Sequence, residues 1–134
     1  MSLGPSPIPR RAPVLVKPPE VVAQDEVTGA TAATAARTIF VPRETGMYGI
    51  QTVGFTTTGG DAGVTIQPNV IHTDRVGAVT EAVGGTLSLA ATGRTPGYLG
   101  FEANAGTAIQ WSTTLAGVRA ASVHDIRVIL TRLR

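Results

Sequence analysis

Six of the nine prolines in this 134-residue chain lie within its first 19 residues, a stretch that contains no acidic residue. Proline has a fixed φ and no backbone N–H, so this stretch cannot form a helix or a central β-strand. It predicts an extended arm close to polyproline II, about 60 Å long at roughly 3.1 Å per residue. Any compact fold must therefore be built from the residues that follow the arm.

From Glu20 onward the chain is rich in Thr, Val, Ala and Gly, and short β-branched segments alternate with glycine-rich turns. No segment has a convincing helical period. This pattern predicts an all-β fold, namely an antiparallel β-sandwich or jelly roll of about eight strands. We expect three parts: the Pro-rich arm at 1–19, an edge strand and linker at 20–36, and the sandwich at 37–134.

Within the second part, residues 20–24 are expected to form the edge strand and residues 25–36 a loop. Pro68 predicts an edge or bulged position, and 92–97 has the composition of a turn. Further strands are expected at 37–41, 47–57, 64–67, 78–83, 86–91, 98–103, 107–113 and 122–133. The expected core, with Phe40 as an alternative to Ile39, is Ile39, Ile50, Val53, Phe55, Val64, Ile66, Leu87, Leu89, Leu99, Phe101, Ile109, Trp111, Ile126, Val128 and Leu130.

Composition narrows the possible partners. Charged residues make up 15% of the chain, below the roughly 25% that is usual in soluble domains. The net charge is +2 and the charges are scattered, so we expect no nucleic-acid partner. There is no run of 18 apolar residues and no signal-peptide pattern, so we expect no membrane partner and synthesis in the cytoplasm. Cysteine is absent, which excludes disulfides.

Few residues suggest chemistry. His72 and Asp74 would share a strand face and, with His124, could form a metal set or a proton relay. The sequence favours a structural role, because Asp74 begins a turn in which its side chain would cap backbone N–H groups. With no cysteine and only two histidines, no hydrolytic constellation can be proposed from spacing. We therefore expect no enzymatic activity, no cofactor and no metal.

Partner-binding residues are expected mainly on the arm. Its basic side chains are suited to carboxylates on a partner, since guanidinium groups make bidentate contacts. The candidates on the arm are Pro7, Ile8, Pro9, Arg10, Arg11, Val14, Leu15, Val16 and Lys17. Val21 and Val22 are candidates for edge-strand pairing with a neighbour. Tyr98 and Trp111 are a weaker candidate for a glycan platform, although Trp111 alternates with polar residues and fits the core better, and Tyr48 is expected to be partly exposed.

Several segments resemble small β-sandwich domains of tailed-bacteriophage virion proteins, over about residues 40–134. Such domains often begin with G-x-Y-x-I/V and place A-G-T/S-x-I-x-Y/W-S before a final alternating strand. The first motif is matched at 46–50 and the second at 105–112, with Trp111 where tyrosine is more usual. Further similar segments are 73–77, 87–94 and 125–133. The resemblance carries over no catalytic residue.

The resemblance implies a virion structural protein with other virion proteins as partners. Three roles are open. The first is a capsid decoration or head-fibre protein, a homotrimer fastened by its arm to the major capsid protein. The second is a tail or baseplate attachment protein whose sandwich binds a host glycan. The third is a free-standing sugar-binding module. The arm favours the first two, and the small size favours the first.

Overall fold

The computed structural model describes residues 18–134, which form nine β-strands and no helix. All the strand pairs are antiparallel, so the predicted all-β architecture is confirmed. No helix able to cross a membrane occurs in this range. The strands are β1 (Glu20–Ala30), β2 (Arg37–Phe40), β3 (Gly46–Thr58), β4 (Thr65–Thr73), β5 (Ala78–Ala82), β6 (Leu87–Ser88), β7 (Gly93–Ala103), β8 (Ile109–Ala116) and β9 (Val123–Arg132).

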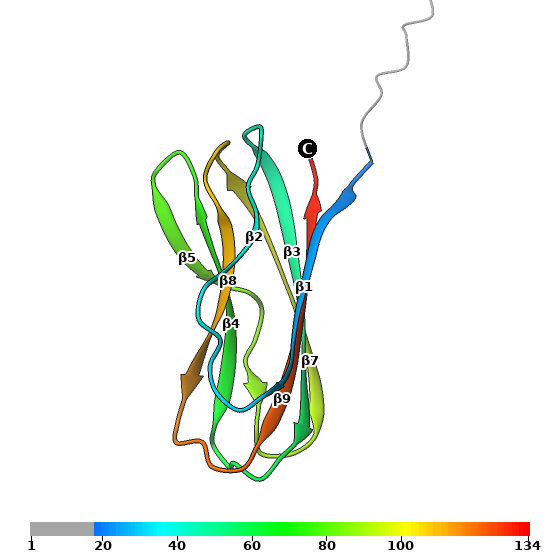
Figure 1. Ribbon diagram of the computed structural model, residues 1–134, viewed down its shortest axis with the longest axis vertical. Helices are drawn as coiled ribbons and strands as arrows, with labels where there is room; N and C mark the ends of the chain where they lie inside the picture. The colour runs from blue at the N-terminus through cyan, green and yellow to red at the C-terminus, as the bar shows by residue number, and fades with distance from the viewer. Residues whose placement is uncertain (1–17) are drawn as a thin grey trace, which may run out of the picture.

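The strands form two sheets that pack face to face (Figure 1). The four-stranded sheet has the order β1-β9-β3-β7. The five-stranded sheet has the order β2-β8-β4-β5, with the short β6 paired to β4. The chain changes sheet at every connection except those from β4 to β5 and from β5 to β6. Two sheets wound in this way make a jelly roll.

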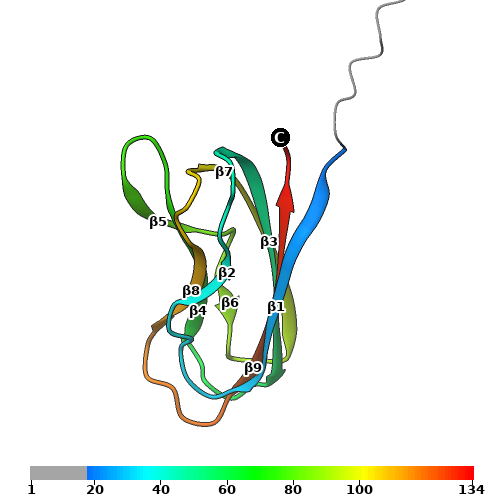
Figure 2. The same ribbon diagram turned by 45° about the horizontal axis from the view of Figure 1, so that its top comes forward.

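The connections gather at the two ends of the sandwich, as Figures 1 and 2 show. The end where β1 begins and β9 finishes also carries loops 41–45, 74–77 and 104–108; we call it the N-terminal end. Loops 31–36, 59–64, 89–92 and 117–122 lie at the opposite, far end. The described chain thus begins and ends at the same end of the molecule.

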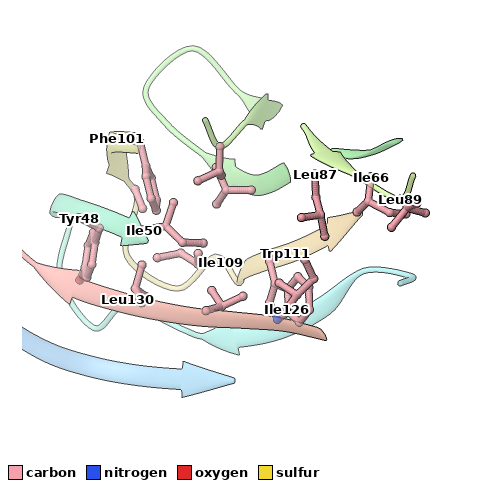
Figure 3. Close-up of a cluster of buried hydrophobic side chains, with 14 of the residues drawn as sticks. Tyr48, Ile50, Ile66, Leu87, Leu89, Phe101, Ile109, Trp111, Ile126 and Leu130 are labelled. Atoms are coloured by element: carbon pink, nitrogen blue, oxygen red, sulfur yellow. The ribbon is translucent and has the colours of Figure 1, made fainter. Parts of the chain in front are cut away.

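The core lies between the sheets and follows the alternation of each strand (Figure 3). Ile126, Val128 and Leu130 of β9 are fully buried, as are Ile109 and Trp111 of β8. Ile39 and Phe40 both pack against this core, because a bulge in the pairing of β2 with β8 falls between Thr38 and Phe40 and interrupts the alternation. Most of the predicted core is confirmed.

Two predicted core residues lie on the other side of β3. The inward residues of this strand are even-numbered, among them Ile50 and Thr52, so Val53 and Phe55 lie on the outer side. Val53 is buried there, at 9% exposed, as predicted, but outside the main core cluster, and Phe55 is half-buried. Tyr48 belongs to the inward set and is only 1% exposed, contrary to the expectation of partial exposure. Its ring stacks on Phe101 with the centroids 6.2 Å apart. The side chains of β3 alternate strictly between the two faces, so odd-numbered residues cannot share the inner face with Ile50.

Three strands are much longer than the sequence predicts. The strand expected at 64–67 continues as β4 to Thr73, because it pairs with β8 on one side and β5 on the other. Residues 25–30 are the second half of β1, because pairing with β9 extends through Ala30 and outweighs the low strand propensity of Gly29. Residues 93–97, predicted as a turn, begin β7 and pair with β3. Pro96 is tolerated there because β7 is an edge strand. In contrast, the predicted strand at 86–91 is reduced to Leu87–Ser88.

Pro68 is neither at an edge nor in a bulge. It lies in the middle of β4, opposite Thr113 of β8. Its carbonyl accepts a hydrogen bond of 2.9 Å from the N–H of Val83, just where the partner of β4 changes from β5 to β6. A residue in an antiparallel strand directs its N and its O to the same neighbour, so the missing N–H faces this gap in the ladder.

The two long sides of the sandwich are closed differently. On the β1–β2 side, the Asp25 carboxylate accepts hydrogen bonds from Arg37 Nε at 2.8 Å and from Trp111 Nε1 at 2.8 Å. On the β5–β7 side, the backbones of Gly84 and Gly97 meet directly. A Cβ on Gly84 would lie 2.5 Å from the Cα of Gly97, and Gly84 also has a φ of +67°, so only glycine fits there.

Candidate partner-binding surfaces

The arm residues expected to bind a partner, at 7–11 and 14–17, lie outside the described residues. The described chain begins at Pro18, which lines a small pocket with Glu20 and the C-terminal residues Arg132, Leu133 and Arg134. The pairing of Glu20 with Arg132 holds the start of β1 against the end of β9. The arm is therefore attached beside the C-terminus at the N-terminal end.

The N-terminal end is tied together by hydrogen bonds between its loops. The N–H of Asn104 donates to Thr73 O at 2.8 Å, and the N–H of Gly106 donates to Pro42 O at 2.8 Å. Arg75 makes a bidentate pair with Glu102, with N–O distances of 3.0 and 2.7 Å, which lowers the pKa of the Glu102 carboxyl. Four large apolar side chains at this end are exposed: Val21, Val41, Met47 and Val76. Exposed apolar groups beside the arm offer contact area to a partner.

Val21 and Val22 lie in an edge strand, as expected, since β1 pairs only with β9. Val21 is 54% exposed, while Val22 packs partly against the core. The register shifts between Val21 and Ala23, so both valines sit at a bulge. Bulges and inward-pointing charges such as Asp25 are features that discourage strand addition. Pairing of these two valines with a neighbour stays a prediction.

The two residues of the expected glycan platform are separated by the fold. Trp111 is fully buried on the inner face of β8, where its indole N–H binds Asp25, so it cannot stack on a sugar. Tyr98 is 58% exposed on the outer face of β7. Its ring reaches over Gly49 of the neighbouring strand β3. A Cβ on Gly49 would lie only 2.5 Å from the Tyr98 hydroxyl oxygen. Only Tyr98 remains available for stacking.

The outer faces of the two sheets differ in charge. The outward residues of the four-stranded sheet include Glu26, Arg94, Glu102, Asp125 and Arg127. The outward strand residues of β2, β8, β4 and β5 contain no charged residue. These residues define the neutral face: Thr38, Thr65, Gln67, Asn69, Ile71, Thr73, Ala78, Thr80, Ala82, Gln110, Ser112 and Thr114.

The histidine and carboxylate candidates do not come together as a metal set, and no group of three potential ligands occurs within residues 18–134. Asp74 caps its own turn, accepting from the N–H groups of Val76 and Gly77 at 2.8 and 3.2 Å, which lowers its pKa. His72 is buried against Phe101, with its Nε2 2.8 Å from Glu81 Oε2. Asp74 and His72 therefore stabilise the turn and the core, respectively.

The far end holds a buried polar cluster that the sequence analysis missed. Asp61 is 5% exposed and accepts hydrogen bonds from the Ser122 hydroxyl and from the N–H groups of Ala120, Ala121 and Ser122. These bonds, led by the hydroxyl, lower the pKa of Asp61 to about 2. In the sequence, the one indication of this buried acceptor is that Asp61 is the single charged residue of a glycine-rich loop.

Arg119 and His124 lie beside this cluster. Arg119 donates to Ala30 O at 2.6 Å and to Ser122 O at 2.8 Å. His124 is fully buried, and neither ring nitrogen has a partner among the described residues. Burial, and then the charge of Arg119, lowers its pKa to about 4. Because the Ser122 hydroxyl donates to Asp61 and not to His124, the cluster lacks the nucleophile–base pair of a hydrolase.

The chain is similar to known proteins in its fold alone. No family model and no curated protein matches the chain. Among solved structures, it resembles a chain of infectious bursal disease virus, Gt strain, with a TM-score of 0.48 and 13% identity over 84% of this chain. A chain of the Gx strain gives 0.48 and 15%, again over 84%. This chain spans 32% of each of those two.

A further match is a virus-like particle of the extra small virus of the giant freshwater prawn Macrobrachium rosenbergii. It covers 98% of this chain and 92% of that one, with 14% identity and a TM-score of 0.27. These similarities are too distant to carry an assignment of function. The tailed-phage origin that the sequence motifs imply stays a prediction.

Proposed function

We propose that this protein is a structural component of a virion, and specifically a capsid decoration protein. Its N-terminal arm binds the major capsid protein or another virion protein, and its jelly roll is displayed on the particle. Several copies act together, with a homotrimer as the favoured assembly. Jelly rolls recur in viral capsid and lectin domains, which is consistent with this role but does not by itself assign it.

The observation that carries the proposal is the polarity of the domain. The described chain starts at Pro18 on the N-terminal end, where Val21, Val41, Met47 and Val76 expose apolar surface. The far end is closed around the buried Asp61, and Val118 is the one large apolar side chain exposed there among the described residues, against four at the N-terminal end. One end therefore has the features of an attachment surface beside the arm, and the other end is available for display.

The test is deletion of residues 1–17 from the full chain. Because β1 begins at Glu20, we expect the truncated protein to fold with an unchanged melting temperature but not to sediment with particles lacking the native protein. Particles can be compared by electron microscopy before and after addition of each protein. Unchanged decoration by the truncated chain would overturn the arm model.

A matched control keeps the length of the arm and removes its charge, by replacing Arg10, Arg11 and Lys17 with glutamine. If these basic side chains bind carboxylates on the particle, the variant binds less tightly than the parent and its residual binding is less salt-dependent. Binding equal to that of the parent would assign the affinity to the apolar arm residues instead.

The second candidate is a tail or baseplate attachment protein that binds a host glycan. The observation in its favour is Tyr98, an exposed aromatic ring whose hydroxyl end lies over Gly49 on the outer face of the sheet. A glycan-array signal that Tyr98→Ala abolishes and Gln24→Ala, at the opposite edge of the same sheet, retains, with both variants folded, would support it. No binding to neutral or charged glycans would exclude it in favour of decoration.

A further inference from the structure

We propose that the edge strand β7 binds residues 14–17 of the arm of another copy, which add to the four-stranded sheet as a further strand. The binding part of β7 is residues 98–102, which we call the open segment. This inference rests on the self-association included in the proposed function and names the two segments that meet. Its support comes from the backbone of β7, from the ends of the open segment and from the reach of the arm.

The backbone of β7 directs half of its hydrogen-bonding groups away from the sheet. A residue in an antiparallel strand directs its N and its O to the same neighbour. The carbonyl of Met47 accepts from the N–H of Leu133 at 2.8 Å, so Met47 is directed to the β9 side and the next residue, Tyr48, to β7. Tyr48 pairs with Phe101, so the odd-numbered residues of β7 are directed to β3. The even-numbered residues are directed outward, where β7 pairs with no other strand of the described chain.

The open segment is bounded at both ends. On one side of it, Pro96 has no N–H, and the backbone of Gly84 meets that of Gly97. On the other side, the N–H of Asn104 is already used, since it donates to Thr73 O at 2.8 Å. Between these limits, three residues direct an N–H and a carbonyl outward with no backbone partner within residues 18–134: Tyr98, Gly100 and Glu102.

The other edges of the two sheets are poorer sites for strand addition. On β1, the N–H of Glu26 donates to Asp25 Oδ1 at 2.9 Å, and register shifts interrupt the pairing with β9 near both ends. β2 has four residues and a shift of its own. β5 is held by five register pairs to β4, whereas β7 is held by eleven pairs to β3. A strand that is already ordered loses less entropy on binding, so β7 is the best template for an added strand.

Residues 14–17 of the arm match the open segment in length and composition. They read Val-Leu-Val-Lys, and β-branched residues favour strands. Pro13 precedes them and Pro18 follows, so their pairing stops at both ends, as that of the open segment does. The four residue steps from Tyr98 to Glu102 measure about 13 Å, and four extended residues cover the same length at about 3.3 Å each.

The reach of the arm selects another copy as the source of the added strand. One row of paired residues joins Glu20 of β1 to Phe101 of β7, so the two are level across the sheet. A strand added beyond β7 lies four strand spacings from β1, which is about 19 Å. The three residue steps from Lys17 to Glu20 span at most about 11 Å. Residues 14–17 therefore cannot reach the β7 edge of their own domain.

The contact joins two different surfaces, the arm of one copy and the β7 edge of the next. Contacts between unlike surfaces can close into rings, including a ring of three, whereas a surface that meets itself gives pairs. The contact is thus compatible with the homotrimer of the proposed function, and it leaves residues 7–11 of each arm for the particle. A four-residue strand makes a small interface, but a closed ring strengthens each contact because all of them must break together.

The experiment is sedimentation equilibrium of the full chain with a proline in the open segment. Gly100→Pro removes an outward N–H and leaves the ladder with β3 intact, so we expect at least tenfold weaker association. The site accepts this change, since Gly100 has no positive φ and a Cβ there would meet no atom closer than 3.9 Å. Gly100→Ala keeps the N–H and should associate like the parent.

Two further variants locate both sides of the contact. Leu15→Pro interrupts the arm segment without changing the domain, and it should also weaken association at least tenfold. It replaces Gly100→Pro if thermal melting shows that the latter does not fold. Thr80→Pro places a proline at an outward position of the β5 edge, so it is the matched control and should associate like the parent.

The proposal is overturned if the parent is monomeric at all concentrations, if folded Gly100→Pro or Leu15→Pro associates like the parent, or if Thr80→Pro weakens association as much as Gly100→Pro does. Particle binding is measured separately. A monomeric parent that binds particles would disprove this inference and leave the proposed function intact. If Gly100→Pro also abolishes that binding, the open segment takes a strand of a particle protein instead. Association through β7 without particle binding would support the inference and contradict the proposed function.

Discussion

The two ends of the sandwich are held together by different chemistry. At the far end, the buried Asp61 carboxylate gathers the 120–122 segment through charge-assisted hydrogen bonds. At the N-terminal end, the ion pairs of Arg75 with Glu102 and of Arg132 with Glu44 lie at the surface. Buried charge-assisted bonds are strong, whereas exposed ion pairs contribute little. The far end is therefore held by the stronger side-chain bonds, whereas the exposed ion pairs add little to the hydrogen bonds between the loops of the N-terminal end.

The largest expected effect follows removal of the carboxylate at the far end. Asp61→Ala leaves the N–H groups of residues 120–122 without an acceptor, and we expect it to lower the melting temperature more than Asp61→Asn, His124→Leu or Arg75→Ala. Asp61→Asn keeps one oxygen and should fall less. Because the folded pKa of Asp61 is about 2, below the 3.8 usual for an aspartate, this stabilisation is present above about pH 4 and is lost as the pH falls towards 2. Equal melting temperatures for Asp61→Ala and the parent would remove the contrast between the ends.

His124 gives the next largest effect. Its folded pKa of about 4 is below the 6.5 usual for a histidine, so on acidification the unfolded chain binds the extra proton before the folded one does. Stability should fall as the pH drops from about 6.5 to about 4, by about 3 kcal/mol in total. Urea titrations across this range should show a steeper loss for the parent than for His124→Leu, which cannot titrate. If the parent and His124→Leu lose the same stability over this pH range, a group other than His124 causes the acid sensitivity.

The smallest effect is expected at the N-terminal end. Arg75→Ala removes an exposed bidentate pair with Glu102, so its denaturant midpoint should stay close to that of the parent. Denaturant midpoints for Arg75→Ala, Glu102→Ala and the double variant give the coupling between the two side chains directly. A coupling as large as the effect of Asp61→Ala would show that this end is as firmly held as the far end.

The alternation of side chains predicted much of the fold. The pattern at 126–130 placed Ile126, Val128 and Leu130 on one buried face, and the turn at 74–77 lies between strands as expected. The errors occurred where pairing with a distant strand outweighs local composition. Residues 25–30 look like a loop because of their small residues, yet β9 holds them in a ladder.

The candidate surfaces were harder to predict because they depend on residues brought together from distant parts of the chain. Asp25, Arg37 and Trp111 form one contact, and Asp61 and Ser122 another, with no pattern in the sequence to relate them. The one available signal for Asp25 is its place in the alternation of Ala23, Asp25 and Val27, which marks it as facing inward. The neutral face likewise becomes visible only after the register of four strands is known.

The length of β1 has a mechanical consequence. Any force that reaches the domain through the residues before Glu20 enters β1 at one end of the strand. The hydrogen bonds to β9 run perpendicular to the strands, so a pull along the strand axis loads them together in shear instead of opening them one at a time. Eight register pairs share that load. The eleven-residue edge strand is thus suited to carry tension between the sandwich and whatever holds the segment before it.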